Sequence, residues 1–112
     1  MKTSELTGAA LDWAVAKCEG WDYLAEQYKG VPYQPITDWA QGGPIIEREK
    51  VQISYGHGLG AKMWFAERYR NYSMGRDTTS QQYGETPLTA AMRCYVASKL
   101  GDEVDVPSEI LK

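Results

Sequence analysis

Apolar positions between residues 6 and 19 recur with the 3.6-residue period of an α-helix. On a helical projection Gly8, Asp12 and Glu19 share one narrow face, and apolar side chains cover most of the remainder. Gly20 can adopt the left-handed conformation that ends such a helix. A helix this apolar has to be covered by the rest of the protein on several sides.

A second helical pattern runs from Pro87 to Leu100. Thr86 can cap its first turn, Pro87 suits the first helical position, and Gly101 can end it. Between Pro87 and Ser98 its only charged residue is Arg93. The pattern therefore predicts a second largely buried helix, with one cation that needs an acceptor or access to water.

The segment between these helices begins with turn-forming residues. Thr37 or Asp38 can cap a short turn at Trp39. The dipeptide Gly43-Pro44 then resembles a second helix start, and we expect one short helix over residues 45–50.

Strict alternation of apolar and polar residues predicts a strand over 51–55, and residues 63–69 predict a second one. The glycine-rich residues 56–62 between them fit a hairpin loop. Residues 70–85 are polar and lack a period, which indicates a long loop, and 104–106 fit a short edge strand.

The remaining stretch, residues 21–34, fits a short strand or irregular structure. Together these elements predict one α+β domain spanning residues 1–112. We expect a small antiparallel sheet packed against two largely buried helices, plus one short helix.

The formal net charge of −3 gives no basic surface for a nucleic acid, so we expect no nucleic-acid partner. No apolar run reaches the roughly 20 residues that a membrane helix needs. The first five residues lack the apolar region of a signal peptide, and we expect a cytoplasmic protein.

Cys18 and Cys94 both fall inside predicted helices and are interpreted as free thiols, with one disulfide as the alternative. With His57 as the single histidine and no Cys-x-x-Cys pair, we expect no metal site and no cofactor. His57 lies in the glycine-rich loop without a visible orienting partner, so it is a poor candidate for a general base.

Three features suggest recognition of a ligand. Eight tyrosines and four tryptophans accompany a single phenylalanine, which is typical of surfaces where aromatic rings meet polar partners. Gly42 and Gly43 could let an anion approach a helix start, although a tight structural turn is the favoured explanation. Arg93 could bind an anionic ligand or form a salt bridge, for example with Asp38.

Arginines and tyrosines also gather near the predicted polar loop. Arg68, Arg70 and Arg76 stand close to Tyr72 and other tyrosines, a combination that suits phosphate binding with base stacking. A solvated strand end and loop is the alternative. The chain contains no Walker loop, nucleophile elbow or metalloprotease helix, and its enzymatic status stays open, with a non-enzyme favoured.

Three stretches of the chain resemble the NinX-like phage proteins, a family of unknown function from tailed phages and prophages. They are residues 4–8 with 11–16, residues 37–47 (Thr-Asp-Trp-Ala-Gln-Gly-Gly-Pro-Ile-Ile-Glu), and residues 86–93 with 95–101. Residues 50–85 resemble the family less clearly. The resemblance implies a phage accessory protein made in the bacterial cytoplasm and carries no catalytic residues over to this chain.

These observations lead to one leading hypothesis, a non-enzymatic phage protein that binds an anionic small molecule and sequesters a host nucleotide signal, as a homo-oligomer. The ligand-binding residues would be Tyr33, Thr37, Asp38, Trp39, Gly42, Gly43 and Arg93. An adaptor that binds a host protein is the alternative, and a nucleotide hydrolase is a third.

Overall fold

The structure is a computed structural model that describes residues 1–20, 32–56, 63–69 and 78–111. Its elements follow in chain order as the 3₁₀ helix η1 (Thr3–Glu5), helices α1 (Gly8–Glu19) and α2 (Trp39–Glu49), strands β1 (Gln52–Tyr55), β2 (Trp64–Tyr69) and β3 (Thr78–Gly84), and helices α3 (Pro87–Leu100) and α4 (Ser108–Leu111). Among the described helices, none combines the length and the hydrophobicity that crossing a bilayer requires.

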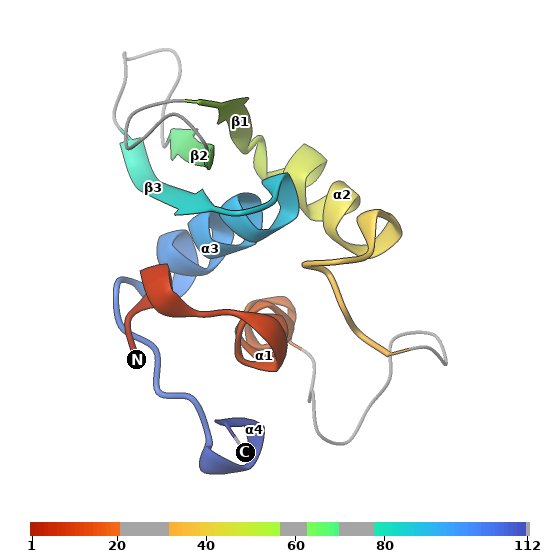
Figure 1. The fold of residues 1–112 in the computed structure, drawn as a ribbon, viewed down its shortest axis with the longest axis vertical. Helices are drawn as coiled ribbons and strands as arrows, with labels where there is room; N and C mark the ends of the chain where they lie inside the picture. The colour runs from red at the N-terminus through yellow and green to blue at the C-terminus, as the bar shows by residue number, and fades with distance from the viewer. Residues whose placement is uncertain (21–31, 57–62, 70–77, 112) are drawn as a thin grey trace.

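Helix α3 is the centre of the molecule and lies between the sheet and α1 (Figure 1). Its bounds are those predicted from the sequence. The Thr86 hydroxyl accepts a hydrogen bond from the Thr89 N–H at 3.1 Å, and Gly101 ends the helix with a φ of 88°. Most of the helix from Leu88 to Val96 is buried, as a helix covered on several sides must be.

The three strands form one antiparallel sheet in the order β1-β2-β3. One face of the sheet packs on α3 through small residues. The Ser80 hydroxyl donates to the Cys94 carbonyl at 2.8 Å. A Cβ on Gly84 would lie 2.5 Å from the Ala90 nitrogen, so only glycine allows this approach. The predicted α+β architecture, with an antiparallel sheet against buried helices, is confirmed.

Strand β3 lies within residues 70–85, where the sequence predicted only a loop. The residues with which β3 packs on α3 include Ser80 and Gly84, neither of which is a large apolar residue. The strand therefore has no alternation of apolar and polar residues to reveal it. Backbone pairing with β2 and close packing on α3 form the strand instead. Residues 70–77, with Arg70, Tyr72 and Arg76, lie outside the described ranges.

Helix α2 is one continuous helix, and the expected second start at Gly43-Pro44 was wrong. Asp38 caps the helix, since its carboxylate accepts from the Ala40 N–H at 2.9 Å. Pro44 removes the hydrogen bond to the Ala40 carbonyl, but Ala40 is exposed and water can solvate that oxygen. Burial of Ile45 holds the helix together beyond the proline.

Smaller differences concern the two ends of the chain. Helix α1 begins at Gly8, after a short 3₁₀ turn, where the sequence predicted Leu6. Residues 104–106 form no strand; instead Glu103 makes an isolated antiparallel bridge to Lys2. The C-terminal helix α4 was not predicted, because four residues are too few to establish a helical period.

The last turns of α1 and α2 meet α3 in a network of ion pairs. Arg48 donates to Glu19 at 2.6 Å and to Glu49 at 2.8 Å, and Arg68 of β2 donates to Glu49 at 2.9 Å. The Tyr95 hydroxyl of α3 donates to Glu19. Burial opposes ionisation of Glu19 and Glu49, but the hydrogen bonds, led by those from Arg48, outweigh it and lower the pKa of both carboxyls.

This network predicts acid sensitivity of the fold. Because the folded pKa values of Glu19 and Glu49 are lower than the unfolded ones, their contribution to stability is complete above the unfolded values and is lost as pH falls through the folded ones. We expect Glu49→Gln to flatten the decline of the free energy of unfolding between about pH 5 and 3. Urea unfolding at several pH values across this range measures the free energy of unfolding. If it falls with pH as steeply in Glu49→Gln as in the unmodified protein, Glu49 does not contribute to the acid sensitivity.

Candidate functional site

The starts of α2 and α3 lie close together in space. Asp38 leads into α2, and Trp39, the first residue of that helix, has an indole that is 54% exposed. Thr86 and Pro87 begin α3, and the next side chain, Leu88, is only 2% exposed. Two capped helix starts therefore frame a surface with an exposed aromatic ring beside a buried apolar residue.

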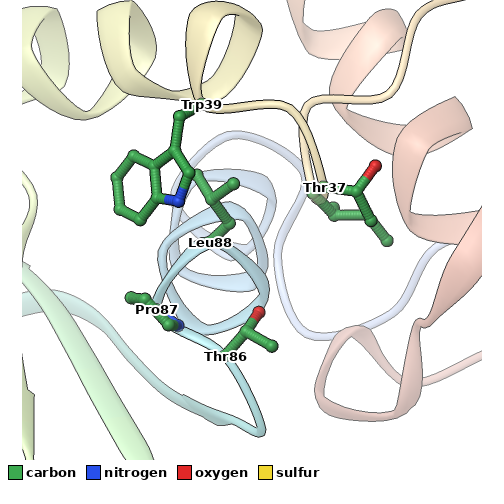
Figure 2. A pocket seen from close by; sticks show the side chains of 6 residues that line it. Thr37, Trp39, Thr86, Pro87 and Leu88 are labelled. Carbon is green, nitrogen blue, oxygen red and sulfur yellow. The ribbon is translucent and has the colours of Figure 1, made fainter.

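A pocket of about 240 Å³ opens between these helix starts. Figure 2 shows Trp39 at the start of α2, Pro87 and Thr86 at the start of α3, and Thr37 on the segment that leads into α2. The lining residues are Ile36, Thr37, Trp39, Thr86, Pro87 and Leu88. We call this cavity the Trp39 pocket.

The Trp39 pocket has apolar walls and a weakly polar edge. None of its six lining side chains carries a charge. The Thr86 hydroxyl is occupied by the helix cap, whereas the Thr37 hydroxyl makes only a 3.5 Å contact with the Gln34 carbonyl. The dipoles of the two helix starts place partial positive charge here, but at α2 the Asp38 carboxylate that caps the helix offsets it. The pocket thus offers an apolar surface and one aromatic ring.

The segment before α2 is fixed to that helix by Gln41, a buried residue. Its side-chain oxygen accepts from the Gln34 N–H, and its side-chain nitrogen donates to the Pro32 carbonyl at 3.0 Å. Gly42 lies against the same segment, because a Cβ there would be 2.4 Å from the Pro35 carbonyl oxygen. These contacts give Gly42 a packing role.

Arg93 is 8% exposed and is held by main-chain carbonyls at both ends of its guanidinium group. Its Nε donates to the Leu6 carbonyl at 2.9 Å, and its Nη1 donates to the Tyr83 carbonyl at 2.8 Å. Burial lowers its pKa, and the charge of Glu85 opposes this shift. The expected salt bridge with Asp38 is absent from the contacts of Arg93 in the described chain, where Asp38 caps α2 instead.

The seven residues that the sequence analysis proposed as ligand-binding do not all lie at one site. Thr37 and Trp39 line the Trp39 pocket, and Asp38 positions Trp39 by capping α2. Four others are not among the lining residues: Tyr33, Gly42, Gly43 and Arg93. Tyr33 is buried in the core, and Gly43 lies 3.9 Å, measured from an ideal Cβ, behind the Trp39 ring.

Sequence reasoning missed Ile36, Thr86, Pro87 and Leu88 as pocket residues. In the sequence, Thr86-Pro87 was recognised only as the start of a helix, and nothing connected it to Trp39. Nothing in the linear sequence shows that residues about 50 positions apart meet.

The remaining groups that the sequence analysis considered are the two cysteines, His57 and Arg68. Cys18 and Cys94 are free, and burial raises the pKa of each thiol to about 11, which keeps both protonated at neutral pH. No three His, Cys, Asp or Glu side chains gather there as a metal site requires. His57 lies outside the described residues, and Arg68 pairs with Glu49.

Comparison with known proteins identifies the family of this chain. A comparison with curated protein sequences finds no match. The sequence profile of the family described as bacteriophage P22 NinX matches residues 2–99, which include α1, α2, the whole sheet and nearly all of α3. The chain belongs to the bacteriophage P22 NinX family and is a phage accessory protein.

Proposed function

We propose that this phage protein is a non-enzymatic binding protein whose ligand occupies the Trp39 pocket. The observation that carries the proposal is the Trp39 indole, 54% exposed at the first position of a capped helix, where it forms one wall of the pocket. Stacking of a planar ligand group on an exposed aromatic ring beside an apolar cavity is favourable, because it removes apolar surface from water.

The ligand class that suits this pocket best is a nucleotide. A nucleobase presents a flat π-face to Trp39 and polar edges to the Thr37 hydroxyl, and base–aromatic stacking contributes about 1–3 kcal/mol. The phosphate would lie towards the positive end of the α3 dipole and away from the start of α2, where the Asp38 carboxylate caps the helix. Arg93 has no part in this version, because it is buried, is not among the pocket's lining residues and is held by two main-chain carbonyls.

Sequestration of a host nucleotide signal in the bacterial cytoplasm is the function that follows for a phage accessory protein with such a pocket. It requires binding without turnover. We extend the proposal to a homo-oligomer, which light scattering of the purified protein tests directly.

Substitution of Trp39 tests the pocket. We expect Trp39→Ala to weaken nucleotide binding about tenfold to a hundredfold, because it removes the stacking surface. Calorimetric titration with a panel of linear and cyclic nucleotides measures the dissociation constants.

Tyr55→Ala is the matched control, since Tyr55 is a similarly exposed aromatic residue (57%) on β1, outside the pocket. Its affinity should equal that of the unmodified protein. Absence of binding by any nucleotide at micromolar concentration would remove the nucleotide version, and equal losses in both variants would remove the pocket.

One observation favours a second candidate, an adaptor for a host protein. The pocket volume of about 240 Å³ lies below the roughly 300–1,000 Å³ of common small-molecule sites and suits a single apolar side chain of a partner. Trp39 would then be the anchor of the interface. Enrichment of one host protein by the unmodified chain and by Tyr55→Ala, but not by Trp39→Ala, would support this candidate.

A further inference from the structure

Asp12 is a buried carboxyl group that the proposed function has not used. It lies on α1 and is 6% exposed, although the sequence pattern placed it on the narrow polar face of that helix. Its Oδ1 accepts a hydrogen bond from the Ile36 N–H at 3.2 Å, and this bond is itself buried. Burying a carboxyl group costs folding free energy, and the hydrogen bond to the Ile36 main chain offsets part of that cost. We therefore ask what this hydrogen bond holds in place.

Ile36 connects this carboxyl to the Trp39 pocket. Its side chain lines the pocket, as does that of its neighbour Thr37. Its main chain belongs to a tight turn in which the Thr37 and Asp38 N–H groups both donate to the Gln34 carbonyl. A shift of Ile36 would therefore move the whole turn that forms this wall.

The turn is attached to the rest of the fold on two sides. Gln41 and Gly42 attach it to α2, which also bears Trp39, so these contacts move together with the aromatic wall. The Asp12 contact comes from α1 and is independent of α2. It is thus the described hydrogen bond that fixes the turn relative to a different helix of the core.

We propose that Asp12 is a positioning residue for the Trp39 pocket, because its carboxyl oxygen holds the Ile36–Thr37 wall in place from the side of α1. The inference rests on the proposed function, in which this pocket holds the ligand. Asp12 lies outside the pocket, on α1. Its substitution should change the pocket without removing any lining side chain.

Asp12→Ala tests the contact without any ligand. The substitution leaves the Ile36 N–H without its acceptor, so amide exchange at Ile36 and Thr37 should accelerate at least tenfold more than exchange in the core of α3. The matched control is Val15→Ala, a core truncation on the same helix that leaves the Asp12–Ile36 hydrogen bond in place. It should lower protection evenly across the fold, and the same even loss in Asp12→Ala would overturn the inference.

Asp12→Asn supplies the conservative variant, since the amide keeps the Oδ1 acceptor but cannot ionise. Burial raises the pKa of Asp12 to about 6, and the Ile36 hydrogen bond opposes this shift; no charged side chain of the described chain contributes to it. The Ile36 amide resonance should therefore titrate near pH 6 in the unmodified protein and lose that step in Asp12→Asn. A step that persists in this variant would contradict the contact.

The sign of the stability change follows from the same pKa. Since the folded value lies above the ordinary value of 3.8, the contribution of Asp12 to stability falls as pH rises from about 4 to 6. Asp12→Asn should consequently be at least as stable as the unmodified protein at pH 7.

Titration with the nucleotide panel separates the inference from the function on which it rests. We expect Asp12→Ala to bind at least fivefold more weakly, with Val15→Ala and Asp12→Asn unchanged. If the unmodified protein binds nothing while the Ile36 exchange responds as described, the positioning contact stands and the nucleotide function falls. If Asp12→Ala binds as tightly as the unmodified protein, the positioning role falls and the function stands.

Discussion

Replacing Gly42 with alanine is expected to destabilise the protein by about 3 kcal/mol or more. A Cβ at this position would lie 2.4 Å from the Pro35 carbonyl oxygen and 2.7 Å from Cδ2 of Leu88. The leucine tip can rotate, but the carbonyl belongs to the turn that Asp12 and Gln41 hold, so α2 or the turn has to move.

Gly43 provides a matched control one residue away in the same helix. The nearest atom to a Cβ there is Cε3 of Trp39 at 3.9 Å, an ordinary contact. Alanine is favoured over glycine inside a helix by about 1 kcal/mol, so Gly43→Ala should leave stability unchanged or raise it. Urea unfolding followed by circular dichroism measures both, and equal effects of the two substitutions would contradict the packing assigned to Gly42.

Arg93 is expected to be the second residue with a large effect on stability. Arg93→Met leaves the Leu6 and Tyr83 carbonyls without their donor while preserving much of the side-chain volume. Hydrogen bonds from charged groups contribute about 1.5–3 kcal/mol each, and removing a buried charge returns part of this. We expect a net loss of about 3 kcal/mol in the free energy of unfolding.

Lys99→Met controls for the loss of a cation from the same helix. Lys99 has a side chain that is 44% exposed and lies 3.9 Å from Glu49, so its removal should cost less than about 1 kcal/mol. If Arg93→Met unfolds like the unmodified protein but no longer binds a nucleotide, then Arg93 is a ligand contact and its carbonyl bonds are incidental.

The ends of α3 could be predicted because their signals are local. Thr86, Pro87 and Gly101 each act on the first or last turn, and the structure begins and ends the helix where they predict. The hairpin strands β1 and β2 were likewise predicted to within one residue, since residues 51–55 alternate in hydrophobicity. Local chemistry was enough for these elements.

Elements that depend on contacts between distant segments were missed. Pro44 normally ends a helix, and only the cap at Asp38 together with the burial of Ile45 keeps α2 continuous. Strand β3 carries a polar sequence whose role is to bring Ser80 and Gly84 against α3. Neither effect is visible in a short window of sequence.

The candidate site shows the same division. The sequence identified Arg93 as a cation in need of acceptors, but its acceptors are carbonyls of Leu6 and Tyr83, and a carbonyl leaves no signature in the sequence. Thr37 and Trp39, which lie two residues apart in the chain, were also named from the sequence. Their meeting with Leu88 in one pocket is a property of the packing of α2 on α3.

Nuclear magnetic resonance of the tryptophan indole N–H groups tests the Trp39 pocket most directly. The chain contains four tryptophans, and among the described ones Trp39 lines the pocket, whereas Trp13 and Trp64 pack partly buried against the core. During titration with the nucleotide panel, the Trp39 indole signal and the Thr37 and Leu88 amides should shift together and saturate, while the Trp13 and Trp64 signals stay in place. Saturable binding that shifts Trp64 and leaves Trp39 unmoved would contradict the site, and so would a Trp39 signal unchanged by every compound.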